Sequence, residues 1–286
     1  MTSTVSVPLR APRKGVPLQR DLELTDGDFA RIRDLIGQCA GIVLADHKRD
    51  MVYSRIGRRV RQRGLTRFGD YLLELESRIG GPEWEAFTNA LTTNLTSFFR
   101  EAHHFPLLVE HFRGRGGPAR VWSAGASTGE EPYSIAMALV ESMGEGADIQ
   151  VLATDIDTEA LQRARRGIYS LEQVRRQLDE QRIRRFFLKG SGRRAGFVRV
   201  RPELAARVRF EPLNLVRGDW STAQYFDAIF CRNVMIYFDK ATQARILERF
   251  APLLKHDGLL FVGHSESFSH ISDRFRLRGQ TVYIKA

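Results

Sequence analysis

The chain has 286 residues, a formal net charge of +10 and 43% hydrophobic residues, so it can bury one large core and a smaller one. It has no apolar run of membrane-spanning length and no apolar signal segment at its start, and its two cysteines match no disulfide or metal pattern. We therefore expect a cytoplasmic protein without membrane insertion that binds an acidic partner.

Residues 1–92 are predicted to form a basic tail and an all-helical domain. Residues 1–20 contain three arginines, one lysine and three prolines but no acidic residue, which indicates a disordered tail. Residues 21–92 have helical periodicity, with Thr25 or Asp26 as the first cap. The other helices of this domain are expected from about Asp46 to Gly64, over 68–77 and over 82–91.

The second of these helices has a strongly basic face. Arg55, Arg58 and Arg59 recur at the spacing that places side chains on one side of a helix. One interpretation is a solvated face, which is the usual role of a charged run. The density of arginine, with little intervening acid, supports a second interpretation in which this face docks an acidic partner.

Residues 93–112 form a bridge that places polar groups among apolar ones. Asn94, Thr96 and Arg100 stand among leucine and phenylalanine residues, so they are candidates for the roof of a pocket. The alternative is an ordinary helix start that is capped by Thr96 or Ser97.

The stretch Ala119–Val140 predicts a strand, a glycine loop and a helix. Gly125 and Gly129 separate an apolar run from a helical pattern, which is typical of cofactor sites in doubly wound sheets. Glu130 and Glu131 follow where a phosphate-binding loop would carry lysine, and two carboxylates suit a cationic cofactor such as S-adenosylmethionine. The alternative is a tight turn that binds no ligand.

The pattern of elements from residue 119 onward predicts an α/β protein. Strands alternate with helices as in a doubly wound, Rossmann-like sheet. Two short β-like runs around Gly190–Gly192 interrupt this alternation and predict a small antiparallel β-subdomain at about 166–209. The later elements are strands over 149–157, 208–216, 225–238, within 256–267 and over 278–286, and a helix over 241–254.

Polar residues follow several of the predicted strands, namely Asp155, Asn214, and Arg232 with Asn233. Since the carboxyl ends of parallel strands meet at one edge of a sheet, these side chains are expected to converge where ligands bind. Asp155 is the better candidate for ribose hydroxyls. Helix capping is the alternative, above all for Asp157.

Methyl transfer fits these groups better than hydrolysis. A side-chain carboxylate has a pKa of about 4, so it is anionic at neutral pH and needs positioning more than a general base. Arg100 and Tyr237 are candidates for orienting it. A hydrolase is disfavoured because residues 263–267 lack the second glycine of a nucleophile elbow. No cluster has zinc spacing, and the adjacent His103 and His104 are interpreted as structural.

Five runs of the sequence resemble the chemotaxis receptor methyltransferase (CheR) family. They are TTNLTSFFREAHHFP, VWSAGASTGEEPYSIA, ATDID, FDAIFCRNVMIYFD and GLLFVGHSESF, in order between about Leu22 and Ile284. The resemblance implies an S-adenosylmethionine-dependent protein-glutamate O-methyltransferase that esterifies glutamates on chemoreceptor cytoplasmic helices. It also implies a helical receptor-docking domain over 21–92 and a methyltransferase domain over 93–286.

The resemblance further implies roles for individual residues. Glu131 would contact the methionyl part of the cofactor, Asp155 the ribose, and Tyr237 the reacting groups with Arg100. The full set of implied cofactor contacts is Asn94, Thr96, Arg100, Glu131, Asp155, Asn214, Leu215, Arg232 and Asn233. The product would be S-adenosylhomocysteine, and no metal is expected. Receptors would dock on Arg55, Arg58 and Arg59, and a receptor C-terminal peptide could add to the β-subdomain as a strand.

Two other functions stay open on the sequence. A nucleic-acid methyltransferase would use the basic charge, but the chain has no recognisable base-reading motif, so no nucleic-acid substrate is expected. A sensor that binds the cofactor without catalysis is disfavoured by Arg100 and Tyr237. The receptor, its modified glutamates and the oligomeric state do not follow from the sequence.

Overall fold

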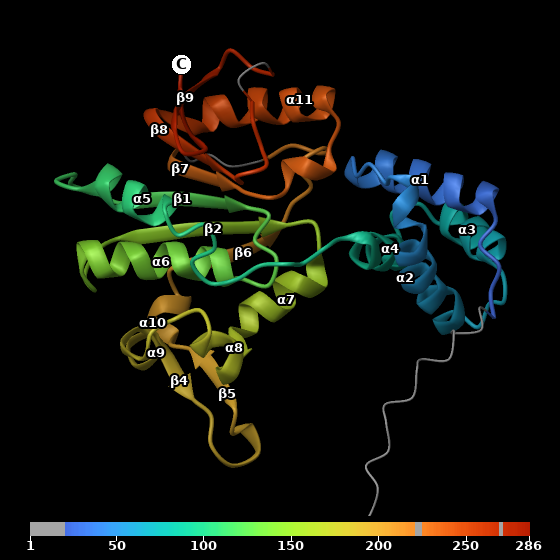
Figure 1. Ribbon diagram of the computed structural model, residues 1–286, viewed down its shortest axis with the longest axis horizontal. Coiled ribbons are helices and arrows are strands. Elements are labelled where there is room, and N and C mark those ends of the chain that lie inside the picture. The colour runs from blue at the N-terminus through green and yellow to red at the C-terminus, as the bar shows by residue number, and fades with distance from the viewer. Residues whose placement is uncertain (1–20, 221–224, 269–270) are drawn as a thin grey trace, which may run out of the picture.

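The computed structural model describes residues 21–220, 225–268 and 271–286 (Figure 1). A group of helices is followed by a seven-stranded, mainly parallel sheet and by a separate antiparallel sheet of three strands. The predicted fold class is therefore confirmed. The tail predicted for residues 1–20 lies outside the described residues. No helix in the described part is both long enough and apolar enough to cross a bilayer.

The N-terminal helices bury a core of their own. Thr25 begins the first helix with a capping box, its hydroxyl accepting from the Asp28 amide at 3.0 Å, and Gly41 ends it in the left-handed conformation. A short 3-10 helix, η1 (Asp46–Lys48), precedes the second helix, which therefore starts slightly later than predicted. The helices are α1 (Asp26–Ala40), α2 (Arg49–Gln62), α3 (Phe68–Ser77) and α4 (Pro82–Leu91).

The large sheet has the strand order β6-β2-β1-β7-β8-β10-β9. Strand β1 pairs in parallel with β2 on one side and with β7 on the other, so the strand order reverses beside β1. A crevice forms at the carboxyl ends of the strands at such a point. The strands are β1 (Ala119–Ala124), β2 (Ile149–Asp155), β6 (Val208–Pro212), β7 (Phe226–Cys231), β8 (Leu254–Val262), β9 (Phe275–Gly279) and β10 (Val282–Lys285).

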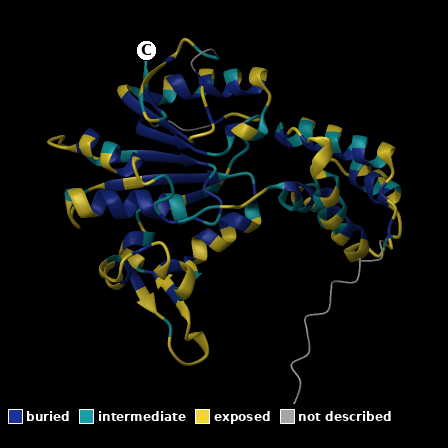
Figure 2. Ribbon diagram, viewed as in Figure 1, coloured by how far each residue is buried: buried dark blue, intermediate teal, exposed yellow. Residues whose placement is uncertain are grey.

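Helices cover both faces of this sheet, and its central strands β1, β2 and β7 are almost entirely buried, whereas the edge strand β9 is largely exposed (Figure 2). Successive side chains of β1 point to opposite faces. Val121 belongs to the core that includes α6, whereas Trp122 packs edge-to-face on Phe250 of α11 in the other core. The main helices are α5 (His104–Phe112), α6 (Glu130–Met143), α7 (Thr158–Arg166) and α11 (Lys240–Phe250).

The small sheet has the order β3-β5-β4 and is antiparallel throughout. The sequence predicted the pairing of β4 with β5, but not the third strand, β3. Tyr169 of β3 donates a hydrogen bond to the Thr128 carbonyl at 2.8 Å, which fastens this sheet to the glycine loop. The elements are β3 (Ile168–Ser170), α8 (Leu171–Arg175), α9 (Glu180–Phe186), β4 (Phe187–Lys189), η2 (Gly192–Arg194), β5 (Phe197–Val200) and α10 (Pro202–Ala205).

Several predicted elements differ from the structure in their bounds. The strand predicted over 225–238 ends at Cys231, because Asn233 has φ +59° and the chain turns into a 3-10 helix, η3 (Met235–Tyr237). The strand predicted over 208–216 ends at Pro212. Strand β9 was missed, and the helix predicted over 241–254 ends at Phe250 before the 3-10 helix η4 (Ala251–Leu253).

Candidate active site

A pocket of about 260 Å³ lies at the carboxyl ends of the central strands, beside the N-terminal helices. Every site residue that was predicted from the sequence lines it, although they come from the bridge, four strand ends and η3. They are Asn94, Thr96, Arg100, Glu131, Asp155, Asn214, Leu215, Arg232, Asn233 and Tyr237. The lining also includes apolar residues that the prediction did not name, among them Ile42, Leu213 and Phe238.

The glycine loop between β1 and α6 requires glycine at two positions. Gly125 has φ +107°, and a Cβ there would lie 2.3 Å from Cγ2 of Val234, another pocket residue. Gly129 has φ +99° at the N-cap of α6, where a Cβ would lie 2.9 Å from the Cβ of Ala164. Both positions therefore need the absence of a side chain as well as a left-handed backbone.

Asp155 presents a fixed carboxylate at the end of β2. Its Oδ2 accepts a hydrogen bond from the Ser127 amide at 2.7 Å, and its Oδ1 accepts one from the Asp157 amide at 2.9 Å. Burial raises the pKa of Asp155, and these backbone donors oppose that shift. An ionised carboxylate has about four acceptor positions, so both oxygens keep capacity for ligand hydroxyls.

Asp157 has a different role, which confirms the capping alternative. Its Oδ1 accepts from the Ala160 amide at 2.9 Å and caps α7. Its Oδ2 accepts from the Thr92 hydroxyl and from the Asn94 side-chain amide, both at 2.6 Å. Asp157 therefore holds the bridge against β2, and one donor of Asn94 is committed to the protein itself.

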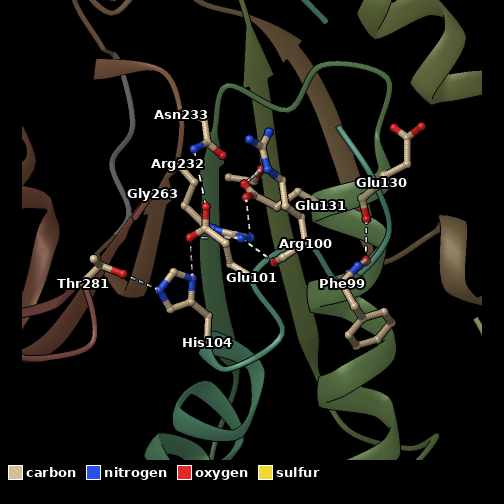
Figure 3. A network of polar contacts seen from close by, with 12 residues as sticks. Phe99, Arg100, Glu101, His104, Glu130, Glu131, Arg232, Asn233, Gly263 and Thr281 are labelled. Atoms are coloured by element: carbon tan, nitrogen blue, oxygen red, sulfur yellow. Dashed lines mark hydrogen bonds and ion pairs between the residues drawn. The ribbon is translucent and has the colours of Figure 1, made fainter. Parts of the chain in front are cut away.

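Arg232 is the centre of a buried charge cluster (Figure 3). Its side chain is 2% exposed, and its Nη1 donates to Oε2 of Glu131 at 3.1 Å. Its Nη2 donates to the Arg100 carbonyl and lies 3.5 Å from Oε2 of Glu101. Burial raises the pKa of Glu131, and the positive charge of Arg232 acts against this rise.

Glu101 belongs to this cluster, and the sequence did not single it out. Its Oε1 lies 3.2 Å from Nδ1 of His264 and accepts from the Asn233 side-chain amide at 3.4 Å. Burial opposes the ionisation of Glu101, but the His264 contact and the charge of Arg232 outweigh it and lower the pKa. These partners follow Glu101 by more than 130 residues, so no local pattern could have indicated the role.

Glu266 explains the segment that was considered as a nucleophile elbow. Its buried carboxylate accepts from the backbone amides of Gly263 at 2.6 Å, Asn233 at 3.0 Å and Ile236 at 3.3 Å. Ser265 is exposed. The segment therefore fixes the turn after β7 and holds Asn233 in its left-handed conformation.

Arg100 and Tyr237 line the pocket, and their polar side-chain groups keep hydrogen-bonding capacity that the protein does not use. Nη1 of Arg100 donates to the Leu95 carbonyl at 2.9 Å. The backbone carbonyl of Tyr237 accepts from the Val43 amide at 2.9 Å, whereas its hydroxyl has no hydrogen bond to the described residues. Both side chains can therefore orient a ligand.

Asn214 connects the sheet to the N-terminal helices. Its side-chain amide donates to the Cys39 carbonyl at 2.8 Å. Its Oδ1 accepts from the amides of Val216 at 2.9 Å and Arg217 at 3.3 Å. The Asn214 amide group therefore serves largely to build the pocket wall, and the neighbouring Leu215 extends that wall with apolar surface.

The predicted docking face on α2 is less uniform than its spacing suggested. Arg59 forms a two-point ion pair with Glu83 at 2.6 and 3.0 Å. Arg55 donates to the carbonyls of Ala90 and Thr92 at the end of α4. Arg58 is exposed and has no acidic partner among the described residues.

The rings of His103 and His104 lie 4.2 Å apart, although adjacent positions on a helix were expected to separate them. Together with Glu101 they place possible ligand atoms within 4.8 Å of one another. Arg232 lies 3.5 Å from the same Glu101 carboxylate, and its charge disfavours a cation there. We therefore assign no metal to this group.

Acid is expected to destabilise the protein through His104. This ring is fully buried, its Nε2 lies 2.9 Å from the Thr281 hydroxyl, and burial with the charge of Arg232 lowers its pKa to about 4. Unfolded histidine titrates near 6.5, so the stability from His104 is complete above pH 6.5. As pH falls toward 4 the unfolded state binds the proton first, and about 3 kcal/mol is lost.

Urea unfolding at pH 7.5 and pH 4.5 measures this effect. The wild type and the exposed-site control His103→Gln should lose more stability on acidification than His104→Gln. Equal losses in all three proteins would show that another group causes the acid sensitivity.

Comparison with known proteins adds family information to this geometry. The profile described as "CheR methyltransferase, all-alpha domain" matches residues 27–92, and that described as "CheR methyltransferase, SAM binding domain" matches residues 94–284. The chain is 58% identical to the chemotaxis protein methyltransferase of Escherichia coli (strain K12), over 98% of each chain. It is 62% identical to that of Klebsiella aerogenes, over 92% of this chain and 90% of the relative. It is 57% identical to that of Salmonella typhimurium, over 98% of this chain and 97% of the relative.

Proposed function

Because the chain belongs to the CheR family of chemotaxis methyltransferases, we propose that it methylates the side-chain carboxylates of glutamates on chemoreceptor cytoplasmic helices. The methyl donor is S-adenosylmethionine, since the SAM-binding profile covers most of the chain. The observation that carries the proposal is the pocket, where two acids, two arginines and a tyrosine from separate segments meet.

The residues of the pocket fit S-adenosylmethionine. Asp155 and Glu131 are acceptors, which suit ribose hydroxyls and a methionyl ammonium, respectively. Each accepts a hydrogen bond or ion pair from the protein, so its position is set before a ligand binds. Leu213, Leu215 and Phe238 supply apolar wall beside them. When bound, this cofactor supplies a methyl group on a positively charged sulfur.

The chain's own contribution to catalysis is positioning. A glutamate carboxylate is ionised at neutral pH, so no general base is required. Arg100 can hold it with two parallel hydrogen bonds, and the Tyr237 hydroxyl, which has no hydrogen bond to the described residues, can donate a third. Such donors reduce the nucleophilicity of the carboxylate, so the gain must come from alignment, which can supply several kcal/mol of the barrier.

The test of this function is incubation with tritiated S-adenosylmethionine and membrane vesicles that carry an overexpressed chemoreceptor. We expect label in the receptor that mild base releases as methanol, which identifies a carboxyl ester. Base-stable label, or label in added RNA, would assign the chain to a different acceptor.

The docking role of α2 is best tested at Arg58 alone. Arg55 and Arg59 hold the helical unit together, so reversing their charge would confuse docking with stability. Arg58→Glu should lower kcat/KM for receptor vesicles about tenfold, through loss of a charge contact and a new repulsion. Affinity for S-adenosylhomocysteine, measured by calorimetry, should not change.

Arg113→Glu is the control for the change in net charge, because Arg113 is a 73% exposed residue beyond α5. If the two variants lower kcat/KM equally, the effect is one of overall charge and α2 is not the docking helix.

The β-subdomain is proposed as a second contact for receptors. Strands β3 and β4 are the edges of the small sheet, so an extended receptor C-terminal peptide could pair with one of them. Leu188 on β4 and Phe197 on β5 are 41% and 49% exposed, which supports side-chain contacts in such a mode.

A further inference from the structure

Two exposed apolar side chains stand at the mouth of the pocket, and a third belongs to a residue whose backbone is hydrogen-bonded to the pocket wall. Leu95 is 78% exposed and Ile236 is 50% exposed, although both line the pocket. Val43 is 59% exposed, and its amide donates to the carbonyl of Tyr237, the residue after Ile236. We refer to Leu95, Ile236 and Val43 as the apolar rim.

The side chains of the apolar rim are not packed into any of the hydrophobic cores of the described residues. Its members come from the bridge, from η3 and from the loop after α1, and none belongs to a buried cluster. Exposed large apolar side chains from distant segments that lie at a pocket mouth or next to its wall are typical of a surface that a partner covers. Because the mouth is the entrance to the proposed active site, that partner is the molecule whose reacting group enters.

We propose that the apolar rim binds the apolar face of the acidic amphipathic helix that carries the target glutamate. The proposal rests on the function proposed above and identifies how that site selects its substrate. Residues three or four positions from a glutamate lie beside it on a helix, about 5–6 Å away. Their side chains therefore meet the rim when the glutamate side chain enters the pocket.

Charge near the rim favours an acidic helix over a neutral one. Arg55 of α2 donates to the carbonyl of Thr92, a pocket residue, so α2 adjoins the wall that continues to Leu95. Arg58 is one turn further along α2, exposed and without an acidic partner among the described residues. A helix that covers the rim can therefore place acids beside α2, whereas a purely apolar partner would leave this charge unused.

Two serine variants test the apolar rim, with the receptor vesicles and tritiated S-adenosylmethionine as probes. Leu95→Ser and Ile236→Ser should each raise the KM for receptor about tenfold, and the double variant should raise it further. The dissociation constant for S-adenosylhomocysteine and the melting temperature should stay at wild-type values. Ile236→Val, which keeps an apolar surface, should retain most of the wild-type KM.

Ile79→Ser is the matched control. Ile79 is 83% exposed in the turn between α3 and α4 and is not part of the pocket lining, so its loss should leave receptor KM unchanged. An unchanged KM in both rim variants would overturn the inference. A weakened cofactor affinity would also overturn it, because the rim would then contact the cofactor instead.

The alternative occupant of the apolar rim is a second copy of this chain. If sedimentation shows a wild-type dimer that Ile236→Ser dissociates, while receptor KM is unchanged, the rim is a dimer contact and the inference is wrong. Failure of the function itself is distinguishable, since the wild type would then release no methanol from labelled receptors, whatever the rim variants do.

Discussion

Arg232→Met is expected to lower the free energy of unfolding by about 3–5 kcal/mol at pH 7.5, which is the usual effect of removing one partner of a buried ion pair. The Arg232 side chain is 2% exposed, and both Glu131 and Glu101 are 11% exposed. Methionine replaces the volume but leaves two buried carboxylates without their common cation. It also leaves the Arg100 carbonyl without its donor.

The loss in Arg232→Met should depend on pH in a definite direction. Burial already raises the pKa of Glu131, and without Arg232 the pKa rises further. When the pKa of a carboxyl group is higher in the folded state than in the unfolded state, its protonated form stabilises the folded state. This contribution to the free energy of unfolding is lost as pH rises through the folded-state pKa. The deficit relative to wild type should therefore be smaller at pH 5.5 than at pH 7.5.

Denaturant unfolding at both pH values measures the Arg232 effect. Arg113→Met removes an exposed arginine from an ion pair with Glu110 and should change stability by less than about 1 kcal/mol. A deficit in Arg232→Met that is equally small, or that grows on acidification, would contradict the assigned charge cluster.

Asp155→Ala should weaken binding of S-adenosylhomocysteine by about 100-fold. Hydrogen bonds to a charged group contribute about 1.5–3 kcal/mol each, and about 1.4 kcal/mol corresponds to a factor of ten. Alanine would remove the proposed ribose contacts and also the acceptor for the Ser127 and Asp157 amides, so the glycine loop loses its fixed position.

Calorimetric titration with S-adenosylhomocysteine measures the Asp155 effect directly. Glu159→Ala, which removes an exposed acid from the first turn of α7, should bind the ligand as the wild type does. Asp155→Asn keeps one carbonyl acceptor and should fall between the two. A change of less than threefold in Asp155→Ala would show that the ribose is held elsewhere.

Features that depend on neighbours in the sequence were predictable. The helices over 68–77 and 82–91 have the predicted bounds, because apolar periodicity and an N-terminal proline are local signals. The strand, glycine loop and helix around Gly125 were also found, since glycine and the change of hydrophobic period lie in one short stretch. Convergence of the strand ends followed from the topology of a parallel sheet.

Features that depend on contacts between distant residues were not predictable. The spacing placed Arg59 on a basic face with little intervening acid, but Glu83 pairs with it from another helix. The roles of Glu101 and Glu266 depend on contacts with residues of the turn after β7. The turn at Asn233 was hidden in an apolar run, because the carboxylate that stabilises its backbone comes from residue 266.

The join between the two family domains has a consequence for how this enzyme can be divided. One profile ends at residue 92 and the other begins at residue 94, and both residues belong to the wall of the same pocket. Asp157 fastens Thr92 and Asn94, and Asn214 fastens Cys39, so each side completes the other. Both domains therefore contribute residues to the active site, and neither domain expressed alone would contain a complete active site.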